Sequence, residues 1–146
     1  MADMRKLTET EIAAWARLMK ASAKLLAQVE RDLKEVGLPP LAWYDALLEL
    51  HRTRPDGLRP TDLEKEMLMP QYNVSRLVDR LEASGYAARC PHPQDGRGQL
   101  LQITDAGTDL TKRMWKVYGR TIAANFALKL GRGEARTLAE LLQRLL

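Results

Sequence analysis

The feature that most constrains this chain is the stretch from Pro70 to Gly85, with the sequence PQYNVSRLVDRLEASG. Its apolar residues follow the i, i+3, i+4, i+7 spacing of one buried helix face. They are Val74, Leu77, Val78 and Leu81. Pro70 suits the first helical turn, because the N–H that it lacks would be unpaired there in any case. Gly85 suits the C-terminal cap. The sequence therefore predicts an amphipathic helix between these two residues.

The opposite face of this predicted helix is polar, with side chains of the kind that hydrogen-bond bases and phosphates. These candidate DNA-binding residues are Gln71, Tyr72, Asn73, Ser75, Arg76 and Arg80. Most of them lie in the N-terminal half, which is the end that a recognition helix inserts into the major groove. An ordinary solvated helix has a similar composition, so the neighbouring segments decide between the two interpretations.

The segment before Pro70 predicts a second, shorter helix. Thr61 and Glu64 have the spacing of a capping box. The helix is expected to run from there to about Leu68, with Leu63 and Met67 facing inward. Two short helices joined by a tight turn are typical of a helix-turn-helix unit.

The segment after Gly85 predicts a β-hairpin. Residues 86–90 and 99–103 have strand character, and two prolines and two glycines make 91–98 an irregular loop. A hairpin directly after a recognition helix forms a wing. Arg97 lies between two glycines that allow the backbone a close approach to a partner, so it is a candidate minor-groove or phosphate contact.

Further helices are predicted on both sides of this unit from apolar periodicity and caps. Their expected ranges are 8–36, 41–52, 104–130 and 134–146, with a short edge strand at 58–59. No apolar run approaches the ~18 residues of a membrane span, and the N-terminus does not have the pattern of a signal peptide. We therefore expect a cytoplasmic protein without a membrane segment.

The amino-acid composition narrows the classes of molecule that this chain is expected to bind. The net charge of +4 and pI of about 9.4 permit nucleic-acid binding without showing it. An aromatic content of 5% disfavours a stacking surface for single strands, which leaves double-stranded DNA as the candidate. The single cysteine, Cys90, excludes an intramolecular disulfide and fits a reducing compartment. It is read as a structural thiol.

Together these segments resemble the MarR family of bacterial winged helix-turn-helix regulators. The residues that carry the resemblance are Ser75–Glu82, Gly85, Arg89, Asp95 with Arg97, and Leu100–Gly107. The match is good over roughly 41–107 and rests on pattern alone in the flanking helices. Pro70 and Tyr72 depart from the family at the groove-facing end, so an operator sequence cannot be transferred.

The resemblance implies a homodimer with the first, fifth and sixth helices at its interface. It also implies that Arg97 enters a minor groove, and that a small aromatic or acidic effector binds between the dimer helices and the DNA-binding lobe. From the residues, Trp15, Met19, Trp43, Tyr44 and His51 are the candidate pocket residues, although such stripes are usually core or dimer packing.

Two charged residues are expected to support the wing rather than to contact DNA. Asp95 should brace it through an arginine, because a carboxylate repels phosphate, and Arg89 is the second support residue. Cys90, His92 and Asp95 do not have a zinc-ligand spacing, so neither a metal nor a cofactor is expected.

The sequence thus predicts a mainly α fold with a small β-hairpin, a winged helix-turn-helix with a helical dimerisation region. Expected boundaries are 1–40 and 105–146 for the dimerisation helices and 41–104 for the DNA-binding lobe. The predicted function is a ligand-responsive repressor that binds a pseudo-palindromic operator as a homodimer. The alternative is a dimeric protein-interaction module that does not bind DNA. An enzyme is not expected, because His51 and His92 lie in no catalytic motif.

Overall fold

The structure, a computed structural model, describes residues 5–68 and 73–146. Helices dominate this part of the chain. They are α1 (Glu9–Glu35), α2 (Leu41–Arg52), α3 (Pro60–Glu66), α4 (Val74–Ala83), α5 (Asp105–Asn125) and α6 (Arg132–Gln143), with a short 3-10 helix at Ala127–Lys129. The strands are β1 (Ala87–Pro91) and β2 (Gln99–Ile103), paired antiparallel. The predicted fold class, mainly α with a small β-hairpin, is confirmed.

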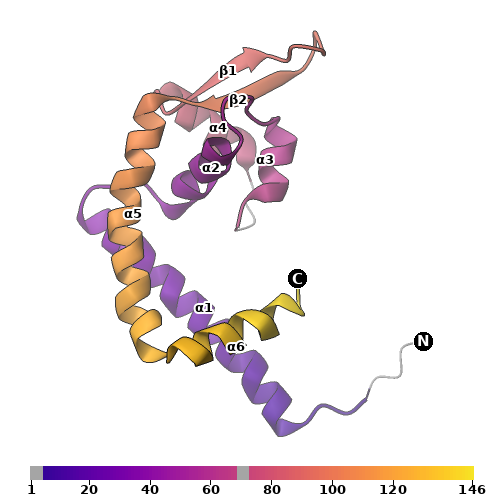
Figure 1. Cartoon of the computed structure of the whole chain (residues 1–146), viewed down its shortest axis with the longest axis vertical. Helices are drawn as coiled ribbons and strands as arrows, with labels where there is room; N and C mark the ends of the chain where they lie inside the picture. Colours follow the sequence, from indigo (N-terminus) through magenta and orange to yellow (C-terminus); the bar gives the residue numbers. More distant parts are fainter. Residues whose placement is uncertain (1–4, 69–72) are drawn as a thin grey trace.

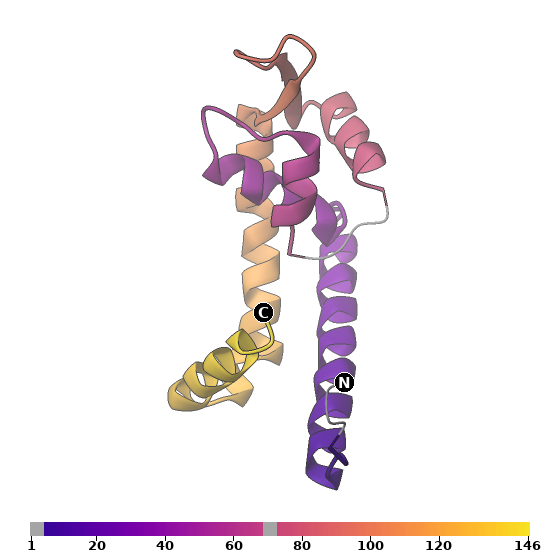
Figure 2. The ribbon, with the colours of Figure 1, turned by 90° about the vertical axis from the view of Figure 1, so that its right-hand side faces the viewer.

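The helices α2 to α4 and the hairpin form a lobe at one end of the molecule (Figure 1). The long helices α1 and α5 extend away from this lobe, and α6 lies at the far end (Figures 1 and 2). A hydrogen bond of 2.5 Å from Thr121 Oγ1 to Asp32 Oδ2 joins the two long helices. No helix in residues 5–68 or 73–146 is long and apolar enough to cross a membrane.

The core of the lobe is built around α2. Leu47 and Leu50 have no exposed surface, and residues from the other elements of the lobe and from both long helices join them. The fully buried members from those elements include Leu33, Leu63, Leu81, Leu101, Leu110 and Met114. Burial of each such side chain contributes about 1.5–3 kcal/mol. One continuous core therefore holds the lobe against α1 and α5.

The hairpin is fixed to this core by β2. Leu101 exchanges two backbone hydrogen bonds with Leu58, of 3.0 and 2.7 Å, so the short edge strand expected at 58–59 is a single bridge. Pro91 pairs with Gln99 as the last residue of β1, and the prediction that the irregular loop begins at Pro91 was wrong. A proline is tolerated there because it lies at the end of a strand, where a missing N–H leaves the ladder intact.

The starts of α3 and α4 differ from the prediction. Pro60 begins α3 and no side chain caps it, so the expected capping box of Thr61 with Glu64 was wrong. Helix α4 begins at Val74 rather than at Pro70, because Asn73 is its cap and accepts the backbone N–H of Arg76 at 3.0 Å. The predicted DNA-binding residues Gln71 and Tyr72 lie outside the described residues, as does Pro70.

Two other helix ends were also predicted wrongly. Helix α5 ends at Asn125 rather than continuing to about residue 130, and a 3-10 turn follows in which Leu128 is 82% exposed. Helix α6 begins at Arg132, with the Glu134 carboxylate accepting the N–H of Gly131 at 2.7 Å, and ends at Gln143. The predicted caps at Thr8 and Thr104 are confirmed.

A close backbone contact between α5 and the hairpin yields a test of this packing. A Cβ added at Gly107 would overlap the carbonyl oxygen of Tyr86. We expect Gly107→Ala to lower the free energy of unfolding by about 1–3 kcal/mol, the usual cost of overpacking. Gly133→Ala in α6 is the matched control, because its Cβ meets nothing within 4 Å and alanine favours a helix. Urea unfolding measures both variants, and a Gly107→Ala protein as stable as wild type would contradict the contact.

Candidate nucleic-acid interface

Helix α4 buries one face and exposes the other, as its sequence predicts. Val74, Leu77, Val78 and Leu81 are each at most 8% exposed. The Gly85 cap is confirmed, with a φ of +80° and the hydrogen bonds from Gly85 N–H to Glu82 and from Tyr86 N–H to Leu81 that close a helix end. The lobe therefore presents the polar side of a rigid, capped helix to solvent.

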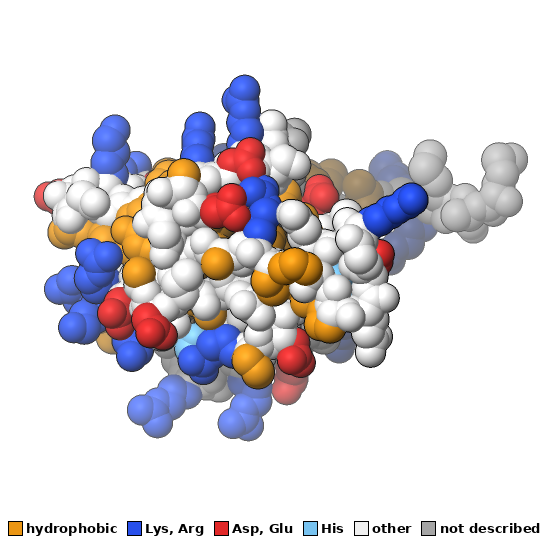
Figure 3. Space-filling view, turned by 90° about the horizontal axis from the view of Figure 1, so that it is seen from above, with side chains coloured by type: hydrophobic (Ala, Val, Ile, Leu, Met, Phe, Trp, Pro, Cys, Tyr) orange, Lys and Arg blue, Asp and Glu red, His pale blue; other side chains and the backbone are white. Residues whose placement is uncertain are grey.

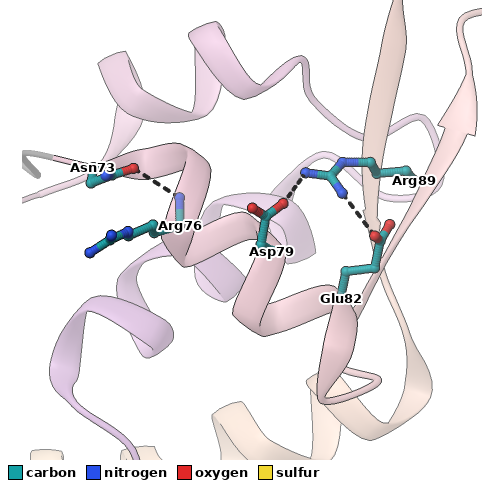
Figure 4. A network of polar contacts seen from close by, with 5 residues as sticks. All are labelled: Asn73, Arg76, Asp79, Glu82 and Arg89. Atoms are coloured by element: carbon teal, nitrogen blue, oxygen red, sulfur yellow. Dashed lines mark hydrogen bonds and ion pairs between the residues drawn. The ribbon is translucent and has the colours of Figure 1, made fainter.

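An arginine clamp joins this polar face to the wing. Arg89 on β1 donates to Asp79 at 2.7 Å and to Glu82 at 2.8 Å, both on α4 (Figure 4). The two acceptors are three residues apart and thus lie on one side of the helix. The hydrogen bond to Asp79 is the main reason that the pKa of Arg89 is raised. The clamp fixes the angle between helix and hairpin and neutralises one of the two negative charges.

The remaining candidates on α4 are exposed. Ser75, Arg76 and Arg80 all point their side chains to solvent. Figure 4 shows the guanidinium of Arg76 directed away from the clamp, and it forms no ion pair within residues 5–68 and 73–146. The Oδ1 atom of Asn73 is engaged in the helix cap. The exposed face thus holds two cations, Arg76 and Arg80, for a partner.

The wing loop is organised by Asp95. One of its carboxylate oxygens accepts the backbone N–H of Arg97 at 3.1 Å, and the other accepts from Arg59 at 3.2 Å. These contacts, the Arg97 N–H first, lower the pKa of Asp95. Because Arg59 directly precedes α3, the bridge links the loop to the helix-turn-helix unit. The side chain of Arg97 remains exposed on this braced loop.

Seen from the hairpin end, lysine and arginine side chains project around the rim of this face, with acidic side chains between them (Figure 3). Such an arrangement fits contact with a polyanion at the edges of the surface. On this face the positive side chains are therefore spread along the rim rather than gathered in one patch.

Comparisons of sequence and of structure identify proteins that are similar to this chain. The sequence model of the MarR family matches residues 36–98, from the end of α1 to the hairpin loop. A MarR family transcriptional regulator of Streptomyces coelicolor, Sco3205, solved in complex with DNA, superposes with a TM-score of 0.89 and 26% identity over 99% of this chain and 91% of that one. The chain thus shares sequence and fold features with the MarR family.

Two curated proteins are similar to this chain in sequence. The multiple antibiotic resistance protein MarR of Escherichia coli is 28% identical over 89 residues, which are 61% of this chain and 62% of that protein. The chain thus aligns with less than two thirds of the E. coli protein's length. The uncharacterized HTH-type regulator YkoM of Bacillus subtilis is 29% identical over 124 residues, 82% of this chain and 78% of YkoM.

The residues predicted to form an effector pocket are not brought together. Tyr44 lines a cavity between α1, α2 and α5. Trp15 and Met19 are 65% and 42% exposed on α1. Trp43 packs edge-on against Tyr86, with ring centroids 6.1 Å apart. Four of the five predicted residues, His51 among them, are absent from the cavity lining.

The sequence analysis missed most of the residues that do line this cavity. Trp115 and Tyr118 on α5 line it together with Tyr44, and so do Glu49 and Arg52 on α2. The spacing of Trp115 and Tyr118, three residues apart on one helix, was the available signal. It became informative only once the fold placed α5 against α2.

The structure offers no metal centre near Cys90 and His92. Cys90 is a half-buried free thiol on β1. No group of three or more His, Cys, Asp or Glu within the described ranges 5–68 and 73–146 is placed to hold a metal ion. The Nδ1 of His92 accepts the backbone N–H of Gln94 at 3.1 Å, so this histidine shapes the loop.

The clamp generates a prediction about DNA binding. Arg89→Ala should lower the free energy of unfolding by no more than about 1 kcal/mol, because partly exposed ion pairs contribute little. Its effect on DNA affinity should be larger, because Asp79 and Glu82 would then repel phosphate without compensation. Arg132→Ala on α6 removes the same charge at the far end of the molecule and should change affinity little. Salt-controlled gel shifts on selected DNA fragments measure this, and partial recovery in Arg89→Ala/Asp79→Ala would assign the loss to the freed carboxylate. Equal affinity of Arg89→Ala and Arg132→Ala would contradict the prediction.

Proposed function

We propose that this chain is a DNA-binding transcriptional repressor that binds a pseudo-palindromic operator as a homodimer. Helix α4 enters the major groove and the β1–β2 wing follows the adjacent minor groove. The observation that carries the proposal is the clamp of Arg89 on Asp79 and Glu82, which sets the angle between α4 and the wing and leaves Arg76 and Arg80 unneutralised.

The division of roles between these arginines follows from their positions. Arg76 lies in the first turn of α4, where a recognition helix reaches base edges, and a guanidinium can bind guanine through two hydrogen bonds. Arg97 is exposed on the hairpin loop and suits a minor-groove or phosphate contact. Ser75, Arg80 and Asn73 complete the proposed contact surface within the described residues, and the predicted contacts Gln71 and Tyr72 lie outside them.

A homodimer is supported by apolar surface at the end of the molecule far from the wing. Trp15 and Ile12 on α1 are 65% and 52% exposed, and Leu141 on α6 and Leu145 beyond it are 47% and 70% exposed. Surface of this kind is normally covered by a partner. A two-fold dimer presents two copies of α4, which is why the operator should be a pseudo-palindrome.

Regulation by a small effector is part of the proposal. The cavity at Tyr44 lies between the long helices and the lobe, so its occupant contacts both regions at once. A repressor of this kind acts in the compartment that holds the chromosome, which is the cytoplasm in bacteria. Catalysis is not proposed, since relatives in this family are transcriptional regulators.

The second candidate function is a dimeric protein-interaction module that retains the winged-helix fold without binding DNA. It is disfavoured by the three exposed arginines at the α4 and wing surface, which such a module would not need. A gel shift on genomic fragments over a series of salt concentrations separates the two functions, because phosphate contacts make affinity fall steeply with salt.

The direct test of the DNA-binding surface is Arg76→Ala. We expect this variant to bind its operator about 1–3 kcal/mol more weakly, with relaxed preference at one base position. The helix cap uses the backbone N–H of Arg76, so the substitution leaves the cap in place. Arg132→Ala is again the charge-matched control. If Arg76→Ala binds the operator as tightly as the wild type, Arg76 is not part of the DNA interface.

The dimer proposal predicts that folding and association are coupled. A stable obligate interface buries upwards of ~2,000 Å², and each Å² of apolar surface contributes about 25 cal/mol. The thermal midpoint should therefore rise with protein concentration. Leu141→Glu should lower the midpoint and abolish operator binding, whereas Gln143→Glu introduces the same charge elsewhere on α6 and should do neither. A folded monomer at micromolar concentration, seen by sedimentation, would contradict the proposal.

A further inference from the structure

The cavity between α1, α2 and α5 has the size of a small-molecule site. Its volume is about 610 Å³, within the roughly 300–1,000 Å³ usual for ligand pockets. Apolar side chains such as Leu26 and Ile122 form part of its wall. Glu66 at the end of α3 and Leu68 beyond it also line the cavity.

One wall of the cavity is a cluster of three aromatic rings. Tyr44 stacks on Trp115 with ring centroids 6.2 Å apart, and Tyr118 meets both rings edge-on at 5.4 and 5.7 Å. The face of an aromatic ring carries negative electrostatic potential, which attracts a cation placed over it. The wall thus suits a flat or methylated organic cation at least as well as a neutral ring.

The charged residues of the lining are mostly acidic. Four carboxyl groups contribute, from Glu30, Asp45, Glu49 and Glu66, against the single guanidinium of Arg52. That guanidinium is already paired with Glu49 at 2.8 Å. An entering carboxylate would therefore find no unpaired cation among the described residues of the lining, and it would face three further carboxyl groups. An entering cation would be attracted by them.

The titration of the lining residues is consistent with a negative interior. Burial is the main cause of the raised pKa of Tyr44, Tyr118 and Glu49, and the charge of Asp45 raises all three further. Glu66 adds to the effect on Glu49. Burial, the larger cause, does not select the sign of a ligand, whereas the charge of Asp45 attracts a positive one.

We propose that this cavity binds an organic cation with an aromatic body, such as an aromatic quaternary ammonium compound, and that this ligand is the effector of the regulator. The proposal rests on the proposed function for its regulatory half only. It replaces the acidic effector that family resemblance implies with one of opposite charge, because the lining of this chain is acidic.

Binding is tested without DNA by isothermal titration calorimetry of the full chain. The probes are benzyltrimethylammonium as the aromatic cation, benzoate as the aromatic anion and benzyl alcohol as the neutral ring. We expect benzyltrimethylammonium to bind more tightly than either of the other two. Tighter binding of benzoate or benzyl alcohol, or the absence of heat from all three, overturns the proposal.

Three variants locate the site. Trp115→Ala should weaken benzyltrimethylammonium binding by about two- to thirtyfold, the range of a cation–π contact, and Trp115→Phe should restore part of it. Glu66→Gln should weaken it by about two- to fivefold. Glu64→Gln removes the same charge from an exposed position on α3 outside the cavity and should have no effect. If neither Trp115→Ala nor Glu66→Gln changes the affinity for the cation, the ligand binds elsewhere and the proposal is overturned.

The regulatory half is measured separately by adding benzyltrimethylammonium to the operator gel shift. We expect the cation to change operator affinity in the wild type and not in Trp115→Ala. If the chain binds the cation but no DNA, the proposed ligand class stands and the proposed function is wrong. If the chain binds DNA and the bound cation does not change that affinity, the cation is not the effector.

Discussion

Burial of the apolar side of α2 is the interaction on which the rest of the structure depends. Leu47 and Leu50 have no exposed surface, and the core around them includes Leu33 of α1, Leu81 of α4 and Met114 of α5. A packed core of this kind transmits displacement rather than absorbing it. The polar face of α4 therefore has a fixed orientation relative to the long helices. In a two-fold dimer held by those helices, the same core fixes the separation of the two recognition helices.

Ion pairing divides the charges of the lobe into two functional groups. On the outer surface, Arg89 offsets acidic residues of α4, so the exposed cations Arg76 and Arg80 are not cancelled by them. In the cavity, Glu49 pairs with Arg52, the one cation among the described lining residues, and three further carboxyl groups remain. The same kind of contact thus leaves a positive surface outside and a negative cavity inside. Opposite charges in the two places allow a polyanion and a cationic effector to bind one protein without competing for the same groups.

The sequence predicted the elements that depend on local periodicity. Helix α2 and strand β2 have their predicted bounds, and the buried face of α4 is the one that its apolar spacing indicates. Ends of elements were less certain where two local signals competed. Pro70 and Asn73 are both good helix starts, and the side-chain hydrogen bond of Asn73 prevailed.

The cavity could not be predicted from the sequence, for a different reason. Its aromatic wall joins Tyr44 to Trp115 and Tyr118, which lie about seventy residues further along the chain, so only the packing of α5 against α2 reveals it. Likewise, the partner of Asp95 was expected to be an arginine, but its identity as Arg59 depends on the Leu58–Leu101 bridge that brings 58–59 beside the hairpin.

A backbone contact in the cavity wall lies close in sequence to the DNA-binding surface. Asp45 Oδ1, in the cavity wall, accepts the backbone N–H of Leu68 at 2.9 Å, and α4 begins six residues after Leu68. The proposed cation would approach a carboxylate that already holds the backbone of Leu68. An effector changes DNA affinity only as far as it binds two arrangements of the protein unequally. Because such coupling is reciprocal, a cation that changes operator affinity must have its own affinity changed by operator DNA by the same factor.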